Sequence, residues 1–345
     1  MKENAKKITQ AHGAGGRDSA ELMRDVFGKH FSNNILDKLE DGAVLPWNVA
    51  ARPVVSTDSF VVKPIEFRGG DIGKLSVCGT VNDLLMMGAI PKYLTCGFVL
   101  EEGLEIATLE RVVASMAATA RAAGVLIVAG DTKVIESSAK ANEGGGGLLI
   151  GASGIGSLRD GATPSASNAR PGDAVVVSGN LGDHHACILS ARMGIENDIA
   201  SDCAILRETT DSLLDNGIDV HVMRDVTRGG LGTVLNEIAA LSDVTVELSE
   251  IDIPVNAGVA AFCGVMGLDP LYMGNEGKMI AIVPKEQAAR AVNLMRATDT
   301  GRNARVIGEI LLPSERDRNL VAMKTKVGGT RRINALFGEG LPRIC

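Results

Sequence analysis

The spacing of apolar positions in the first half of the chain predicts an alternation of strands and helices. A glycine-rich segment at 12–16 precedes a helix that we expect to begin at Asp18 or Ser19. Residues 52–62 read as two short strands on either side of Thr57-Asp58, because aspartate is a poor strand residue. Further on, strands are expected at 92–100, 124–130 and 148–157, and an alanine-rich helix at 105–123.

A long helix is expected to open at Gly69-Gly70-Asp71 and to run to about Gly88. Small residues recur every three positions along it and leave a smooth face for another backbone: Gly73, Ser76 and Gly79. The same spacing places Asn82 and Asp83 within an apolar stretch. Because a buried carboxylate is costly unless it is paired or bound to a cation, Asp83 is a candidate ligand.

The second half of the chain repeats the strand–helix–strand pattern. Turn-forming residues concentrate at 158–172, which is the best candidate for a domain boundary. Beyond it we expect strands at 173–178, 243–250, 279–283, 304–310 and 319–323, and helices between 183 and 216 and at 231–241, 256–266 and 285–297. The predicted fold class is therefore α/β (α+β) with two related domains. Their expected limits are 41–158 and 170–327, with an N-terminal segment at 1–40 and a C-terminal tail at 328–345.

Composition narrows the classes of function. The 345 residues are 45% hydrophobic and 22% charged, as in ordinary globular domains. A net charge of −7 and only 3% aromatic residues argue against a nucleic-acid partner. No apolar run approaches the ~20 residues of a membrane span and no signal-peptide pattern opens the chain, so we expect a cytoplasmic protein without a membrane partner. The six cysteines include no CxxC pair, and all but Cys345 read as buried packing residues.

Aspartates recur where the predicted elements meet: Asp58, Asp71, Asp83, Asp131 and Asp225. Hard oxygen ligands on separate elements are what Mg²⁺ needs when it binds together with nucleotide phosphates. The glycine-rich turns at 13–16 and 229–232 could supply backbone N–H donors for phosphate, and Lys133 a positive charge. The segment around Gly73-Lys74 lacks the first glycine and the Ser/Thr of a P-loop, and no dinucleotide fingerprint is present. These residues favour a metal–ATP site.

The chain ends in Leu341-Pro342-Arg343-Ile344-Cys345, so its last residue carries both a thiol and the α-carboxylate. Spaced glycines from Gly328 onward predict a mobile tail. Fully extended at roughly 3.3 Å per residue, residues 328–345 could span on the order of 60 Å and reach another site.

Four segments resemble signatures of the ATP-binding PurM-like superfamily: Ser56-Thr57-Asp58, Gly70-Asp71-Ile72-Gly73, Val81-Asn82-Asp83-Leu84 and Gly130-Asp131-Thr132-Lys133. That superfamily includes aminoimidazole ribonucleotide synthetase, selenophosphate synthetase and thiamine-phosphate kinase. With His12-Gly13-Ala14-Gly15-Gly16 near one end and Pro342-Arg343-Ile344-Cys345 at the other, the chain resembles the HypE family of hydrogenase maturation proteins over nearly its whole length. His185 stands where a small residue is expected in that family, which leaves the role of His184-His185 open.

The resemblance implies a fold, a reaction and partners. Two subunits would form a homodimer by pairing their N-terminal sheets into a shared β-barrel, with ATP and Mg²⁺ near the cleft between domains. The carbamoyltransferase HypF would place a carbamoyl group on Cys345, and ATP would drive its dehydration to a thiocyanate. Cyanide would then pass to iron on a HypC–HypD complex, for use in [NiFe]-hydrogenase.

The expected site residues follow from the motifs and the resemblance together. Beside Cys345, the first candidate for the catalytic base is Glu276 and the second is Lys133 in its neutral form. The expected metal ligands are Asp58, Asp83, Asp131 and Asp225. Further nucleotide contacts are expected from Gly15, Gly16, Asp71, Asn82, Thr227 and Asn275.

Two alternative functions stay open. The chain could be a small-molecule kinase or synthetase of the PurM-like superfamily, or a non-catalytic ATP-binding scaffold of a maturation complex. Selenophosphate synthetase would need a cysteine or selenocysteine in the N-terminal glycine-rich loop, and residues 11–18 contain none. The other small-molecule enzymes would have no use for Cys345, and a scaffold would not turn over ATP in response to a carbamoylated tail.

Overall fold

The N-terminal half is built on a four-stranded sheet in the order β1-β6-β4-β5. The computed structural model describes residues 6–14, 16–38, 42–137, 147–313 and 320–336. The strands are β1 (Pro53–Phe60), β4 (Ala89–Glu101), β5 (Leu126–Ile135) and β6 (Leu148–Leu158). β6 pairs antiparallel with both β1 and β4, and β4 pairs parallel with the edge strand β5.

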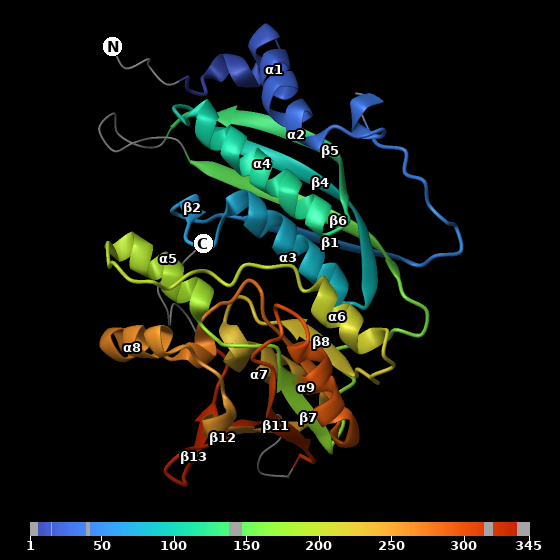
Figure 1. The fold of residues 1–345 in the computed structure, drawn as a ribbon, viewed down its shortest axis with the longest axis vertical. Helices are drawn as coiled ribbons and strands as arrows, with labels where there is room; N and C mark the ends of the chain where they lie inside the picture. The colour runs from blue at the N-terminus through green and yellow to red at the C-terminus, as the bar shows by residue number, and fades with distance from the viewer. Residues whose placement is uncertain (1–5, 15, 39–41, 138–146, 314–319, 337–345) are drawn as a thin grey trace.

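Helices α3 (Ile72–Met86) and α4 (Ile106–Ala122) cover one face of this sheet (Figure 1). α3 is buried along almost its whole length, because it lies between the sheet and the C-terminal half. Its N-terminus is capped by Asp71, whose Oδ1 accepts hydrogen bonds from the backbone N–H groups of Gly73 and Lys74 at 2.7 and 3.0 Å. A helix buried on every side carries its polar residues into the interior, and α3 brings Asn82 and Asp83 to the junction of the two halves.

The N-terminal segment lies over the same sheet near β5 (Figure 1). It consists of η1 (Gln10–Gly13), α1 (Arg17–Leu22), the π-helical turn η2 (Met23–Gly28), α2 (Lys29–Phe31) and η3 (Leu36–Lys38). The short pair β2 (Glu66–Phe67) and β3 (Gly70–Asp71) leads into α3.

The C-terminal half holds a seven-stranded sheet in the order β13-β12-β9-β11-β7-β10-β8. Its strands are β7 (Asp173–Val177), β8 (Val222–Asp225), β9 (Thr245–Ser249), β10 (Met279–Pro284), β11 (Arg305–Leu311), β12 (Val321–Lys324) and β13 (Thr330–Ile333). Its helices are α5 (Asp183–Met193), α6 (Arg207–Leu214), α7 (Gly230–Ser242), α8 (Ala257–Met266) and α9 (Ala288–Arg296). Alternate residues of β7 face α7 on one side of the sheet and α9 on the other, so this sheet is covered on both faces.

Three local predictions were wrong. Residues 53–60 form one continuous strand, because every residue of β1 is paired with β6, Asp58 with Ala152. β5 does not end at Asp131 but continues to Ile135 along β4. The predicted tail begins too early, because Thr330–Ile333 forms the edge strand β13 and Ile333 is 1% exposed.

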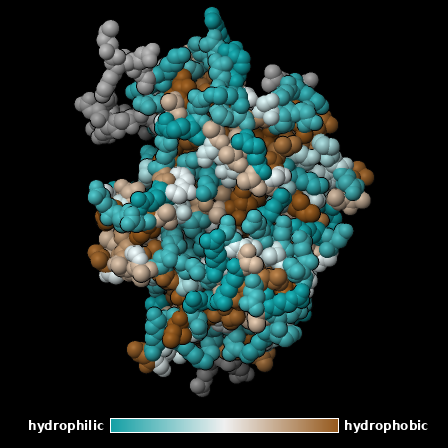
Figure 2. Space-filling view, in the orientation of Figure 1, coloured by the Kyte–Doolittle hydropathy of each residue, from teal (hydrophilic) through white to brown (hydrophobic). Residues whose placement is uncertain are grey.

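Several other features agree with the sequence. Cys78, Cys96, Cys187, Cys203 and Cys263 are all buried and free, as predicted. Among the helices of the described ranges, none combines the length and apolarity that a membrane crossing requires. Figure 2 shows one side of the molecule covered mainly by hydrophilic residues, with hydrophobic residues scattered between them.

Candidate active site

Carboxylates from both halves meet at the domain junction. Asp58 comes from β1, Asp83 from α3 and Asp225 from the end of β8. The hydroxyl of Ser56 donates to Oδ2 of Asp83 at 2.6 Å, and a guanidinium nitrogen of Arg228 lies 4.0 Å from Oδ1 of Asp58. Three of the four predicted ligands thus gather from separate elements, which is how such sites are commonly assembled.

The negative charge in this cluster is only partly balanced. Burial raises the pKa of the Asp83 carboxyl, against the hydrogen bond from Ser56, and the nearby Asp58 raises it further. Burial and the charges of Asp83 and Asp58 raise the pKa of Asp225 to about 7. Carboxylates that hold one another's pKa high are stabilised when a cation arrives, because it removes their mutual repulsion.

The donor set fits Mg²⁺ bound together with a nucleotide. Within the described ranges, no group of three or more His, Cys, Asp or Glu side chains is placed to hold a metal ion. Mg²⁺ commonly takes one or two protein carboxylates and completes its shell with water and substrate phosphates, so a preformed cage is not required. Asp58, Asp83 and Asp225 offer the hard oxygen atoms that this arrangement needs.

Glu276 lies beside this cluster, in the loop between η5 (Pro270–Tyr272) and β10. Burial, followed by the charges of Asp202 and Asp225, holds the pKa of Glu276 well above its usual range. Asn275 anchors the loop: its Oδ1 accepts from the backbone N–H of Gly182 at 2.8 Å, and its Nδ2 donates to the carbonyl oxygens of Val226 and Met273. With Asn275 0% exposed, the structure gives its side chain a positioning role next to Glu276.

The side chains of Asn82 and Asp71 both form hydrogen bonds with backbone groups. Asn82 bridges the two halves, because its Nδ2 donates to the carbonyl of Ala204 at 3.0 Å and its Oδ1 accepts from Leu206 N–H at 2.9 Å. The cap formed by Asp71 uses one carboxylate oxygen on α3. A nucleotide contact from either side chain stays a prediction, but each already fixes the helix that carries Asp83.

Asp131 and Lys133 lie apart from the cluster within one chain. They form an ion pair, 3.2 Å between Nζ and Oδ2, and both are exposed. The register pairs Asp131 with Gly97 and Gly97 with Gly151, whereas Asp58 pairs with the next residue, Ala152. Asp131 therefore points to the opposite face of the sheet from Asp58, and three strand spacings of ~4.8 Å separate β5 from β1.

The glycine-rich turns are held by close backbone packing. A Cβ on Gly13 would lie 2.8 Å from the Val134 side chain of β5. Gly229 and Gly230 have φ of +80° and +62°, and the N–H of Gly230 donates to the carbonyl of Thr227 at 3.0 Å. This turn feeds the N-terminus of α7 beside Arg228, close to Asp58, where a phosphate would meet backbone N–H groups.

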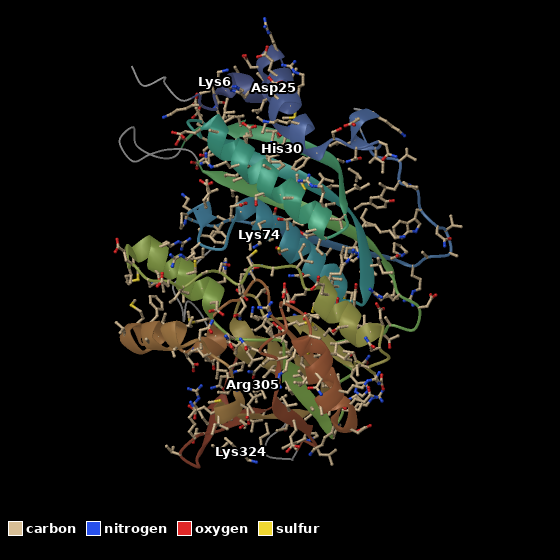
Figure 3. The ribbon with its side chains drawn as sticks, viewed as in Figure 1. Lys6, Asp25, His30, Lys74, Arg305 and Lys324 are labelled. Carbon is tan, nitrogen blue, oxygen red and sulfur yellow. The ribbon has the colours of Figure 1, made fainter. Side chains whose placement is uncertain are left out.

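Two of the predicted residues lie outside the described ranges, and two glycine-rich positions lie away from the cluster. Gly15 and the terminal Cys345 are not among the described residues, whereas Gly16 precedes α1 near β5. Lys74, labelled in Figure 3, donates from Nζ to the carbonyl oxygen of Gly69 at 2.9 Å. That local contact agrees with the absence of a P-loop pattern in the sequence.

The two adjacent histidines are part of the protein interior. His184 is 2% exposed, contacts the hydroxyl of Ser201 through Nδ1 at 2.8 Å and packs edge-on against Phe67. Burial lowers the pKa of His184 to about 4. His185 is 5% exposed, and its Nδ1 lies 3.5 Å from the backbone nitrogen of Gly274. Both side chains therefore join α5 to its surroundings.

Two residues near the cluster were not predicted from the sequence. Arg228 follows Thr227 in a glycine-rich turn and lies near Asp58. Because that turn was expected to bind phosphate, its position in the sequence was the signal that could have identified Arg228. Asp202 contacts the Glu276 loop, but it lies in an irregular segment between α5 and α6 with no motif around it. Only the tertiary structure brings it to the site.

The chain is similar to known proteins over nearly its full length. Residues 39–158 match the family described as AIR synthase related protein, N-terminal domain, and residues 170–313 match the corresponding C-terminal domain. Carbamoyl dehydratase HypE from Cupriavidus necator is 46% identical over 341 residues, covering 98% of this chain and 95% of the relative.

Solved structures give the same result. A crystal structure of hydrogenase maturation protein HypE in complex with ATP superposes with a TM-score of 0.92 at 46% identity, covering 98% of this chain and 100% of that one. A crystal structure of a HypE–HypF complex superposes with a TM-score of 0.77 at 41% identity, covering 91% of this chain and 99% of that one.

Proposed function

Because the chain belongs to the HypE family of carbamoyl dehydratases within the AIR synthase related proteins, we propose that the junction cluster is where it dehydrates a carbamoyl group on Cys345. The chain is an ATP-dependent carbamoyl dehydratase that converts a thiocarbamate to a thiocyanate, the source of the cyanide ligand of [NiFe]-hydrogenase iron. The observation that carries the site is the convergence of Asp58, Asp83 and Asp225 beside Glu276.

The chemistry requires an amide oxygen to leave. The carbamoyl oxygen attacks the γ-phosphorus of ATP, ADP departs, and the oxygen becomes part of a phosphate ester. The C–O bond then breaks with loss of phosphate while the nitrogen gives up its protons, which leaves the S–C≡N group. Positioning and charge neutralisation dominate the first step, and a base is needed for the second.

The residues divide these tasks. Asp58, Asp83 and Asp225 would hold Mg²⁺, which neutralises charge on the transferred phosphoryl group when bound. The turn at Thr227 to Gly230 would offer backbone N–H groups to the phosphates, with Arg228 as a nearby cation. Glu276 takes the proton from nitrogen, because a carboxylate with a raised pKa is a stronger base than an exposed glutamate.

Lys133 and Asp131 would enter this site from a second subunit. If two four-stranded sheets close into one barrel with β1 of one subunit beside β5 of the other, these two side chains would approach the cluster along the shared edge. The open face of the sheet, which carries the exposed Val55, Thr57 and Ser59, supports that arrangement.

The partners follow from the reaction. HypF, found in complex with a HypE relative, is the partner that would load Cys345. Transfer of cyanide to a HypC–HypD complex and a location in the cytoplasm complete the proposal. With nine residues beyond Leu336, the terminal segment could extend on the order of 30 Å, enough to serve more than one site.

Intact-protein mass spectrometry tests the reaction. Incubation with the HypF partner and its carbamoyl donor should add one carbamoyl group, and the adduct, re-purified free of nucleotide, should lose one water only when Mg-ATP is supplied. The C345S variant should acquire neither change. An adduct on the wild-type chain that Mg-ATP leaves intact would contradict the dehydratase assignment and favour the scaffold alternative.

A further inference from the structure

Asp202 is a buried carboxylate that contacts the main chain of the catalytic loop. Its side chain is 4% exposed. Oδ1 accepts a hydrogen bond from the backbone N–H of Glu276 at 3.1 Å, and Oδ2 accepts one from Gly277 at 3.2 Å. Lys278 Nζ lies 3.2 Å from Oδ2 and balances the charge. Hydrogen bonds from two successive N–H groups fix the direction in which Glu276 leaves the backbone.

The two segments are in close backbone contact. A Cβ on Gly277 would lie 2.0 Å from the carbonyl oxygen of Asp202 and 3.0 Å from the nitrogen of Ala204. Only glycine allows this approach. The N–H of Ala204 donates back to the carbonyl of Glu276 at 3.3 Å. The main chain of Glu276 is thus bound on its N–H side by Asp202 and on its carbonyl side by Ala204.

The same segment reaches the helix that carries the acidic cluster. The carbonyl of Ala204 accepts from Asn82, and Leu206 N–H donates to the same side chain. Asn82 immediately precedes Asp83 on α3. A continuous series of hydrogen bonds therefore runs from Asp83's neighbour, through residues 202–206, to Glu276, and it crosses between the two halves of the protein.

We infer that Asp202 is a positioning residue, which holds Glu276 in register with the Asp58, Asp83 and Asp225 cluster. The inference rests on the proposed function, in which Glu276 removes the proton from nitrogen. A displacement of about 1 Å in a reacting group can lower a rate on the order of 10²-fold, so the hydrogen bonds of Asp202 have a direct consequence for turnover.

Asp183 provides a matched control. It is also a buried aspartate, 8% exposed, and it accepts from Nδ2 of Asn256 at 2.6 Å. It lines the same cavity of about 950 Å³ as Asp202, but its hydrogen bond is to Asn256, which immediately precedes α8, and not to the loop of Glu276. D183N changes charge and burial as D202N does, without touching the backbone of the catalytic loop.

The test compares single and double variants on the carbamoylated full-length chain, with single-turnover conversion to thiocyanate as readout. E276Q should slow conversion by at least about 10²-fold. D202N should slow it by roughly 10- to 100-fold with the KM for ATP changed less than about twofold. Because Asp202 acts through Glu276, D202N/E276Q should be no slower than E276Q alone. D183N should convert at the wild-type rate.

Each outcome separates this inference from the proposed function. A wild-type adduct that Mg-ATP does not convert, or an E276Q variant as fast as wild type, contradicts the proposed function. With both of those as expected, a D202N rate equal to wild type, or losses in D202N/E276Q that multiply, overturns the inference and leaves Asp202 a structural residue. If D202N does not fold, D202E, which keeps the charge opposite Lys278, is compared with D202E/E276Q in the same way.

Discussion

Single carboxylates in this protein differ in how their charge is balanced, and the difference separates the positioning residue Asp202 from the candidate metal ligands. Asp202 has Lys278 and two backbone N–H groups as partners. Asp83 has the neutral hydroxyl of Ser56, and the pKa of Asp225 rises to about 7. A buried charge with incomplete compensation is costly for folding but is suited to binding a cation.

The residues of the site were predictable to different degrees. Asp83 in an apolar helix and Glu276 in a glycine-rich loop are unusual placements for charge, and the structure brings both to one junction. Asp202 was missed because its partners are backbone N–H groups more than seventy positions away, and no sequence pattern encodes them. Asp131 has a recognisable motif, but its face of the strand depends on register.

His184 predicts a pH dependence of stability. Burial lowers its pKa to about 4, from 6.5 in the unfolded chain, so the unfolded state takes up the proton first as pH falls. Above pH 6.5, His184 is neutral in both states and the free energy of unfolding keeps its full value. As pH falls from 6.5 to about 4, the free energy of unfolding decreases by up to ~3 kcal/mol. Replacing it in H184Q should flatten the pH dependence of the free energy of unfolding in that window, as measured by denaturant titration.

The neighbouring Asp183 provides a control of opposite sign. Burial raises its pKa to about 6 from 3.8, so the folded state binds this proton more tightly and stability falls as pH rises between those values. In D183N, the free energy of unfolding should therefore lose the decrease that Asp183 causes as pH rises toward neutral. In H184Q, it should lose the decrease that His184 causes as pH falls into the acid range. Equal pH profiles for H184Q and wild type would mean that His184 is not held neutral.

At the scale of elements, packing between segments accounts for the differences from the predicted fold. β1 includes Asp58 because β6 pairs with the strand along its whole length, both before and after that residue. β13 was missed because glycines precede it and its exposed residues are polar, while Ile333 alone enters the core. Long helices and buried strands were predicted well, since their periodicity arises from burial itself.

The small residues on α3 allow a test at this scale. The predicted close approach of another backbone is confirmed at Gly73, because a Cβ there would lie 2.4 Å from the carbonyl oxygen of Val112 in α4. G73A must push two buried backbones apart and should lower the free energy of unfolding by about 1–3 kcal/mol. A Cβ on Gly264 in α8 would meet no atom within 4 Å, so G264A should stabilise by up to about 1 kcal/mol. A neutral G73A in denaturant unfolding would mean that α3 and α4 do not pack this closely.

At the scale of the whole molecule, the N-terminal sheet is unevenly covered. α3 and α4 cover one face, while the opposite face carries exposed Val55, which is 67% exposed, together with Asp131 and Lys133. Its two edges, β1 and β5, each have one neighbouring strand among the described residues. Open edges and an open face are the features that pairing with a second copy would cover.

The proposed homodimer predicts that two inactive variants restore each other. If the cluster of one subunit uses Asp131 of the other, D83N and D131N homodimers should both be nearly inactive. After unfolding and refolding together, half of the molecules should be mixed dimers, each with one site made of wild-type Asp83 and Asp131. The mixture should then reach about a quarter of wild-type activity, as expected for a two-fold dimer that exchanges at random.

Size-exclusion chromatography with light scattering checks that dimers have formed. A mixture of D83N with D225N is the control, because both changes fall in the same half of the site and no mixed dimer regains an intact site. Activity of the D83N and D131N mixture no higher than this control would show that Asp131 does not complete a site across subunits.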